Sequence, residues 1–319
     1  MFRIVFLSLI LLLSTQAGAQ PYPTKPIKLV VPFPPGGVAD IIARPLAEGL
    51  TNYLGQPVLV DNKGGATGTI GASFVANAPP DGYTLLLGTS NEITMSPTLF
   101  KTLPYDPNTA FTPITPVGEF PNVLVVGPSV TSKNLNEFIE LIRSKPNKIT
   151  FASSGTGSTN HLTAVLFANQ AKLDIVNVPY RGGGPALADL LGGQVDALFA
   201  TLPSAMAQIK AGKLRALAVT GNVRSAVLPD VPTIKELGIA GVVVTTWNGV
   251  LAPAKMPPKL TKQIHDAIAH VAEEPSFKEK MLAVGVEPVI LPSAEFSARI
   301  KAEYEKWSAL IKRSGMTIE

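Results

Sequence analysis

The amino-acid sequence has no cysteine and few charged residues, and both shortages narrow the functions it can have. Without cysteine, the chain has no disulfide scaffold, thiolate zinc site, iron–sulfur cluster or cysteine nucleophile. Charged residues make up 16% of the sequence, and the formal net charge of +4 is spread along the chain. Because no basic run is present, we expect no nucleic-acid partner.

Short catalytic and phosphate-binding motifs are also missing. The sequence contains no G-x-S-x-G, H-E-x-x-H or G-x-x-x-x-G-K-[ST] segment. His265 and His270 are five residues apart on one predicted helix, so they do not share a face and do not form a metal-binding pair. The sequence therefore predicts no catalytic residue, no metal site and no cofactor, although missing motifs alone do not exclude catalysis.

The N-terminal residues have the pattern of a secretory signal peptide. Arg3 precedes an apolar run at 4–13, and Ala17-Gly18-Ala19 follows it as a cleavage site. The run is too short to span a membrane, which takes about 20 apolar residues. We expect residues 1–19 to be removed after Ala19 and the mature protein to be exported. The alternative is a buried N-terminal helix or strand.

The rest of the chain alternates between short apolar runs and amphipathic segments. The apolar runs predict strands near 27–33, 57–60, 84–88, 122–126, 149–152, 175–178, 195–199 and 214–219. Helices are predicted near 38–53, 69–77, 135–144, 158–171, 185–192, 203–211, 258–273 and 293–314. The proline-rich stretch at 97–116 is interpreted as a break between two such series. Repeated strand–helix units predict an α/β protein with mostly parallel sheets covered by helices, and 319 residues suffice for two domains.

Four predicted strand-to-helix turns are rich in glycine and hydroxyl residues. They lie at 33–40, 65–68, 88–91 and 153–161. The free N–H groups at a helix N-terminus favour a carboxylate or phosphate, and glycine lets the backbone approach such a ligand closely. In open α/β sheets, ligands bind at the carboxyl ends of the strands, where these turns lie. The four turns therefore indicate an anion-binding site; the alternative is ordinary tight turns.

Eight segments, in order, carry a family resemblance. They are PFPPGGVAD (32–40), APPDGYTLLLGTS (78–90), LPYDP (103–107), PNVLVV (121–126), FASSGTGSTNHL (151–162), VPYRGGGPALADLLGGQVD (178–196), KLRALAVT (213–220) and LPDVPTIKELG (228–238). Together they resemble the Bug family, the periplasmic substrate-binding proteins of tripartite tricarboxylate transporters. The resemblance covers residues 22 to about 315.

This resemblance implies a two-domain periplasmic-binding-protein (Venus flytrap) fold with two mixed or mostly parallel sheets flanked by helices. Domain 1 would comprise residues 20–121 and 247–319, and domain 2 residues 122–246. The implied function is to capture a small mono-, di- or tricarboxylate between the domains and deliver it to the membrane permease subunits of a tripartite transporter. We expect a periplasmic monomer that is not an enzyme. The alternatives are a secreted enzyme on the same scaffold and a ligand sensor for a membrane signalling protein.

The candidate ligand-binding residues come from the glycine-rich turns and from family positions. They are Phe33, Pro35, Gly36, Gly37, Asp40, Ala66, Thr67, Gly68, Ser90, Asn91, Ser153, Ser154, Gly155, Thr156, Gly157, Ser158, His161, Tyr180, Arg181, Gly182, Gly183 and Ala200.

Three of these candidates also have structural interpretations. Asp40 could cap a helix, Arg181 could form a surface or hinge salt bridge, and His161 could hold its own loop. Two positions depart from the family pattern, because Ala200 and Val165 stand where relatives often have acidic residues. Loss of a cleft-facing acid would disfavour ligands that carry an amino group, so a carboxylate without a cation is expected.

Overall fold

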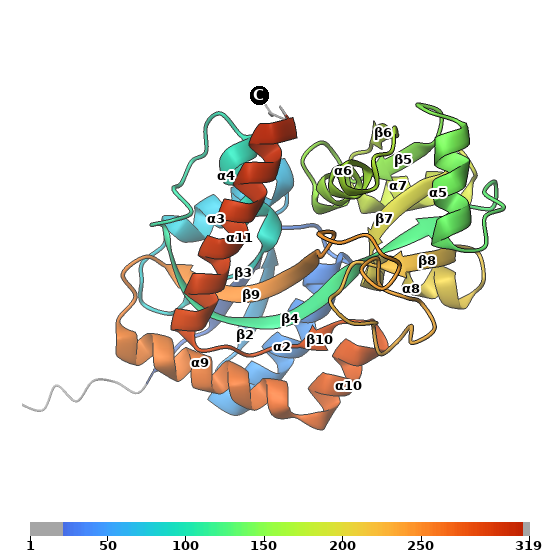
Figure 1. Cartoon of the computed structure of the whole chain (residues 1–319). Helices are drawn as coiled ribbons and strands as arrows, with labels where there is room; N and C mark the ends of the chain where they lie inside the picture. The colour runs from blue at the N-terminus through green and yellow to red at the C-terminus, as the bar shows by residue number, and fades with distance from the viewer. Residues whose placement is uncertain (1–21, 315–319) are drawn as a thin grey trace, which may run out of the picture.

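Strands and helices alternate along the chain in the computed structural model, which describes residues 22–314 and has two lobes joined by long strands (Figure 1). The first lobe begins with β1 (Ile27–Val31), α2 (Val38–Leu54), β2 (Val58–Asn62), the turn η2 (Ala66–Gly68) and α3 (Thr69–Ala76). It continues with β3 (Thr84–Thr89), the π-helical turn η3 (Asn91–Met95) and α4 (Ser96–Leu99). Its last elements are β9 (Thr245–Pro253), α9 (Pro258–Glu273), α10 (Pro275–Ala283), β10 (Glu287–Pro288) and α11 (Ser293–Ser314).

The second lobe lies between these two parts of the chain. It contains α5 (Leu135–Ser144), β5 (Thr150–Ser153), α6 (Thr159–Ala171), β6 (Val176–Pro179), α7 (Gly183–Leu191), β7 (Ala197–Thr201), α8 (Leu202–Lys210) and β8 (Arg215–Val219). The predicted helices at 135–144, 258–273 and 293–314 are confirmed with the bounds expected from the sequence. The strand β9 and the helix α10 were not predicted.

One strand, β4 (Phe111–Val126), belongs to the sheets of both lobes. Along the sheets the order is β2-β1-β3-β9-β4-β7-β5-β6, and β8 and β10 also pair with β4. Residues 111–121 of β4 pair with β9, whereas residues 122–126 pair with β7. β1 is parallel to β2 and β3, and β5 is parallel to β6 and β7, while β4 pairs with its neighbours antiparallel. The expectation of two mixed sheets flanked by helices is thus confirmed.

The proline-rich stretch is not a break over its whole length. That interpretation was wrong from Phe111 onward, because β4 starts there and passes through Pro113 and Pro116. The pairing of β4 with β9 shifts register between Pro113 and Thr115 and again between Pro116 and Gly118. At such bulges a residue is left without a ladder hydrogen bond, so a proline, which has no N–H, can be accommodated.

Helices α2, α9 and α10 pack on one face of the first lobe's sheet, and α3 and α11 pack on the other. Ile42, Leu46 and Leu50 recur every four residues on α2, and all three side chains are buried in the same apolar cluster. Helix α9 packs against α2 at Gly49, where an added Cβ atom would lie 2.4 Å from Cγ1 of Val271. The absence of a side chain at this glycine allows the two helices to approach closely.

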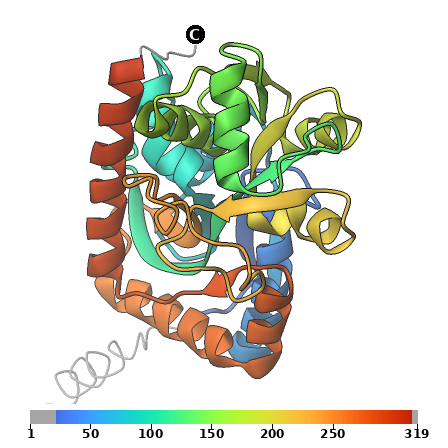
Figure 2. The same cartoon turned by 45° about the vertical axis from the view of Figure 1, so that its right-hand side comes forward.

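The helix α11 runs along the side of the molecule past both lobes (Figure 2). Near its start, Phe296 packs edge-to-face on Trp247 of β9, with ring centroids 5.0 Å apart. Further along, Trp307 and Ile311 join the apolar cluster of the second lobe, as do Met95 and Leu99. Contact between the lobes therefore also involves η3, α4 and the end of α11, in addition to the shared strand.

Within residues 22–314, no helix is both long and apolar enough to cross a bilayer. The predicted signal peptide at 1–19 lies outside the described residues.

Candidate functional site

The first candidate loop connects β1 to α2 and contains Phe33 to Asp40. Asp40 is 3% exposed. Its carboxylate accepts hydrogen bonds from the Gly36 N–H (2.9 Å), the Arg44 guanidinium (2.8 and 3.0 Å) and the Asn62 amide (3.0 Å). Burial alone would raise the pKa of this carboxyl, but these hydrogen bonds lower it. Both carboxylate oxygens already have two protein donors each, so Asp40 fixes the shape of the loop from within.

The backbone of this loop also satisfies part of its own hydrogen bonding. The Gly36 N–H donates to Asp40, and the Gly37 N–H donates to the carbonyl oxygen of Pro34 at 3.4 Å. Gly36 has a φ of +81°, and its Cα faces open space. The two amides that the sequence suggests as anion donors are thus already used inside the loop, and only the open space over Gly36 favours a ligand here.

The second candidate turn, η2, has a strained backbone. Ala66 and Thr67 have φ values of 44° and 54°, a region that residues with a side chain rarely adopt. Such conformations cost about 1–3 kcal/mol each and occur frequently at binding sites. Gly68, with a φ of +93°, lies so close to its neighbours that an added Cβ would be 3.2 Å from the Phe33 ring and 3.0 Å from Glu92. The first two candidate turns therefore contact each other.

Glu92 is a buried carboxyl beside these turns that the sequence analysis did not single out. Its side chain is 0% exposed and accepts a hydrogen bond from the Thr89 hydroxyl (2.6 Å) and another from the Thr89 N–H. Burial raises its pKa to about 7. Glu92 directly follows the predicted turn at 88–91, and the Asn91 N–H donates to the same Thr89 hydroxyl at 3.1 Å. A lone acidic residue after a strand gives no sequence signal that distinguishes it from a surface residue.

The fourth candidate turn connects β5 to α6 in the second lobe. The Ser158 hydroxyl caps α6 by accepting a long hydrogen bond from the His161 N–H at 3.4 Å, and it donates to the Gly155 carbonyl at 2.7 Å. The Gly157 N–H donates to Nδ1 of His161 at 3.1 Å. Three groups suggested as ligand donors, namely the Ser158 hydroxyl and the N–H groups of Gly157 and Ser158, thus have partners within the turn.

His161 stays neutral more readily than an exposed histidine. Burial lowers its pKa. Because Nδ1 accepts the Gly157 N–H, the proton of the neutral ring lies on Nε2. His161 therefore holds its own loop, which was its structural interpretation, and still has one N–H that can donate to a ligand.

Asn160 is a second residue that the sequence analysis missed. Its amide donates to the Phe199 carbonyl of β7, and its side-chain oxygen accepts from the Ser154 hydroxyl. Ala200, the next residue on β7, is buried in an apolar cluster with Val123. The structure therefore places Ser154 at the turn and Ala200 in the core.

The turn between β6 and α7 has no buried residue. An added Cβ at Gly182 or Gly183 would meet no heavy atom within 4 Å. The Tyr180 hydroxyl donates to Asp189 at 2.7 Å, and this hydrogen bond raises the pKa of Tyr180 to about 12. Arg181 is exposed.

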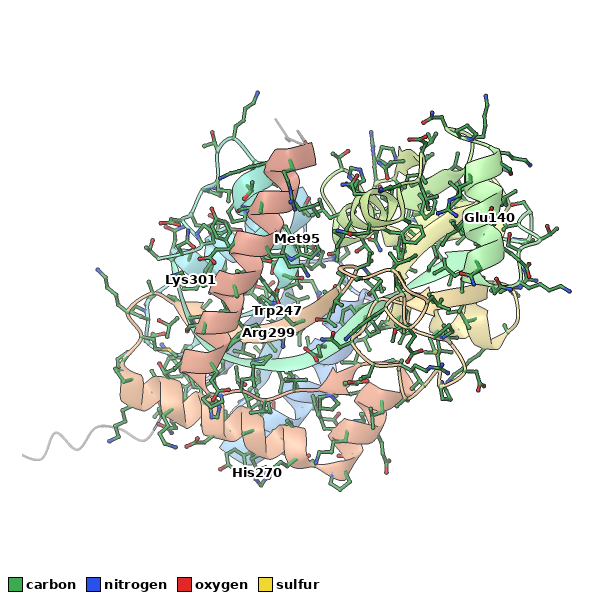
Figure 3. All side chains as sticks on the ribbon, viewed as in Figure 1. Met95, Glu140, Trp247, His270, Arg299 and Lys301 are labelled. Carbon is green, nitrogen blue, oxygen red and sulfur yellow. The ribbon has the colours of Figure 1, made fainter. Side chains whose placement is uncertain are left out.

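The candidate turns of the two lobes meet at η3, α4 and the start of α6. The Thr159 hydroxyl donates to Oδ1 of Asn91 at 2.8 Å and lies 3.8 Å from the sulfur of Met95. At Gly157 an added Cβ would be only 2.5 Å from Cδ1 of Leu99. Figure 3 shows Met95 near the middle of the molecule, where the lobes adjoin. The third and fourth candidate turns are thus brought together from segments 68 residues apart.

Two surface hollows lie away from these turns. One, of about 400 Å³, lies between α2 and β2 beside Arg44 and Thr51, and the other, of about 670 Å³, lies beside Pro128 and Arg215. Neither is lined by a candidate residue, so the site is defined by the facing turns and not by these hollows. Among residues 22–314, no group of three or more His, Asp or Glu side chains could hold a metal ion.

The fold and the facing turns define a periplasmic solute-binding protein, and comparisons with known proteins support this class. A structure of the periplasmic binding protein BugD is 35% identical, covers 93% of this chain and 100% of its own, and superposes with a TM-score of 0.83. The sequence model described as "Tripartite tricarboxylate transporter family receptor" matches residues 42–316. The chain belongs to this family of periplasmic receptors, which bind solutes and are not enzymes.

Individual relatives cover nearly the whole chain. Protein BugT of Bordetella pertussis is 36% identical over 96% of this chain and 94% of its own. A protein of R. palustris solved with adipate is 34% identical, covers 93% of this chain and 99% of its own, and has a TM-score of 0.86. MatC of Rhodopseudomonas palustris, solved with bound malate, is 31% identical, covers 91% of this chain and 100% of its own, and has a TM-score of 0.81.

Proposed function

We propose that this receptor binds a small carboxylate between its two lobes and delivers it to the permease subunits of a tripartite transporter. The observation that carries the proposal is the meeting of the glycine-rich turns of the two lobes at Asn91 and Thr159. Turns at the carboxyl ends of strands are where α/β proteins bind anions. The adipate and malate bound in two related structures are small carboxylates of this kind.

The ligand contacts are proposed from the groups that remain available. Nε2 of His161 donates from the second lobe, and the open turn at Gly182 and Gly183 lets a ligand approach the backbone. Asp40 and Ser158 position the two main loops through their internal hydrogen bonds. Neutral N–H donors such as Nε2 of His161 and backbone amides suit a carboxylate, because a hydrogen bond to an ionised acceptor is stronger than one between two neutral groups.

The lobes act as the two domains of a hinged receptor. We assign residues 20–121 and 247–319 to domain 1 and residues 122–246 to domain 2. The strand β4 changes partners from β9 to β7 at Pro121 and Asn122, which makes this point a hinge candidate. Contacts made only in the closed form shift the population toward it when the ligand binds. Small-angle scattering tests this motion: the radius of gyration falls on saturation with ligand, and an unchanged curve contradicts it.

Mass spectrometry of the native protein and calorimetry test the binding function. Protein purified without refolding is expected to carry a small carboxylate. A thermal-shift panel including adipate and malate identifies candidates because a ligand stabilises the folded state.

The substitution His161→Ala weakens binding about tenfold or more, as expected for loss of a hydrogen bond to a charged acceptor. His270→Ala is the matched control, since His270 stacks on Tyr53 elsewhere on the surface. Unchanged affinity in folded His161→Ala excludes this contact.

Export is tested on the mature protein. N-terminal sequencing of periplasmic protein should begin at Gln20, and an intact Met1 would contradict cleavage after Ala19. Sedimentation of the same sample should give a monomer of one mature chain.

A further inference from the structure

Three buried side chains with unpartnered polar atoms lie where β3 ends and β9 begins. They are Ser90, Thr246 and Asn248, whose exposed fractions are 0%, 4% and 1%. The Ser90 hydroxyl, the Thr246 hydroxyl and the Asn248 amide nitrogen have no hydrogen-bond partner in the described part of the chain. Asn248 lies opposite Thr89 in the β3–β9 ladder, and Ser90 is the next residue after Thr89. The three residues therefore gather at one end of the first sheet.

Thr246 and Asn248 share one face of β9 because they are two residues apart. The same face continues with Val250 and Ala252, which are buried in the apolar cluster under α2 and α9. Trp247, which lies between Thr246 and Asn248 in the sequence, points to the other face and packs on Phe296. The row of side chains on this face thus changes from apolar to polar at its end nearest the candidate turns.

This polar end adjoins the candidate site through Thr89. The Thr89 hydroxyl donates to Glu92, and an added Cβ at Gly68 would lie 3.0 Å from Glu92 and 3.2 Å from the Phe33 ring. On the other side of β9, Thr246 pairs with Phe120 of β4, one residue before the point where β4 passes between the lobes. The three residues therefore lie beside the candidate turns and next to the point where β4 passes between the lobes.

A buried donor without a partner in the chain is stabilised when an atom from outside the chain accepts its hydrogen bond. Proteins pair more than nine in ten of their buried polar groups, and leaving one unpaired is costly. An amide N–H needs an oxygen acceptor, while a serine or threonine hydroxyl can donate or accept. A carboxylate or a hydroxyl group satisfies all three side chains, whereas an alkyl group satisfies none.

We propose that Ser90, Thr246 and Asn248 form an inner subsite that binds the far, oxygen-bearing end of a two-ended ligand. This inference rests on the proposed function, in which the turns of the two lobes hold the first carboxylate. The ligand class is then a dicarboxylate or a hydroxycarboxylate. A monocarboxylate with an alkyl tail fills the site but leaves the three polar atoms unpaired, so it binds more weakly.

Calorimetry with matched ligands and matched variants tests the subsite. Adipate and hexanoate have the same carbon chain, and only adipate has a second carboxylate; malate adds a hydroxyl. Thr246→Val and Asn248→Leu keep the number and branching of the side-chain heavy atoms and remove the polar atoms. Asn177→Leu is the control, because Oδ1 of Asn177 is also buried and unpartnered but lies on β6, four strands from β9.

With this subsite, the wild-type protein should bind adipate or malate at least tenfold more tightly than hexanoate. Asn248→Leu should weaken adipate or malate about tenfold to a hundredfold and change hexanoate less than twofold. Equal effects on both ligands, or none, in variants with unchanged melting temperature would overturn the subsite and leave the proposed function standing. If the variants unfold, Ser90→Ala repeats the comparison. A wild-type protein that binds no carboxylate overturns the proposed function and the subsite together.

Discussion

The buried carboxyl of Glu92 makes the stability of this protein depend on pH. Burial raises the pKa of Glu92 from 4.5 in the unfolded chain to about 7 in the folded one. Below pH 4.5 the carboxyl is protonated in both states and costs nothing. As the pH rises toward 7, the unfolded chain releases the proton first, so the folded state loses stability relative to it. Above pH 7 both states are ionised and the loss is complete.

The size of this loss follows from the shift. A difference of one pKa unit corresponds to about 1.4 kcal/mol, so a rise from 4.5 to about 7 lowers the free energy of unfolding by roughly 3 kcal/mol. Glu92→Gln removes the titration and keeps the shape of the side chain. The Thr89 hydroxyl, which now donates to Glu92, can accept from the glutamine amide instead. As the pH rises, the free energy of unfolding of Glu92→Gln should therefore fall far less than that of the wild type.

Urea unfolding, followed by circular dichroism across the range from pH 4.5 to above 7, measures this effect. The free energy of unfolding of the wild type minus that of Glu92→Gln should fall by about 3 kcal/mol over the range and then level off. Glu137→Gln is the control, because Glu137 is exposed on α5. A difference between wild type and Glu92→Gln that stays constant with pH would refute the reasoning.

Three further substitutions test the packing and the loops. Asp40→Ala should lower the free energy of unfolding by about 1–3 kcal/mol in urea titrations, because it removes the carboxylate that accepts hydrogen bonds from Gly36, Arg44 and Asn62; a loss below 0.5 kcal/mol would contradict this role. Gly157→Ala should lower the melting temperature, since its Cβ would lie 2.5 Å from Leu99 in a left-handed backbone. The loss should be smaller in a Leu99→Ala background. Arg299→Met should destabilise the protein by about 1–3 kcal/mol, because it removes the ion pairs of Arg299 with Glu119 (2.7 Å) and Glu303 (3.0 Å) and leaves Glu303 with only the Trp247 N–H as a donor within the described residues; Arg143→Met on the exposed face of α5 should change stability little.

Local patterns were sufficient to predict most helices and strands. The apolar spacing on α5, α9 and α11 predicts their bounds correctly, because an amphipathic helix needs only residues three and four positions apart. The strand β9 was missed, since it is buried among β3 and β4 and has no alternation of polar and apolar residues. Pro113 and Pro116 were misleading for a related reason: their place in β4 depends on bulges opposite β9.

The candidate site, like the fold, was predicted only in part from the sequence. The sequence by itself determined that glycine-rich turns follow the strands, that they resemble those of a carboxylate receptor, and which residues they contain. Only the tertiary structure decided which groups in them remain available. Asp40, Gly157 and Ser158 are engaged within their own loops, while Glu92 and Asn248 lie beside the candidate turns at positions without any local signal. The physical reason is that a hydrogen bond or a contact is set by distance in space, and neighbours in space such as Asn91 and Thr159 are far apart in sequence.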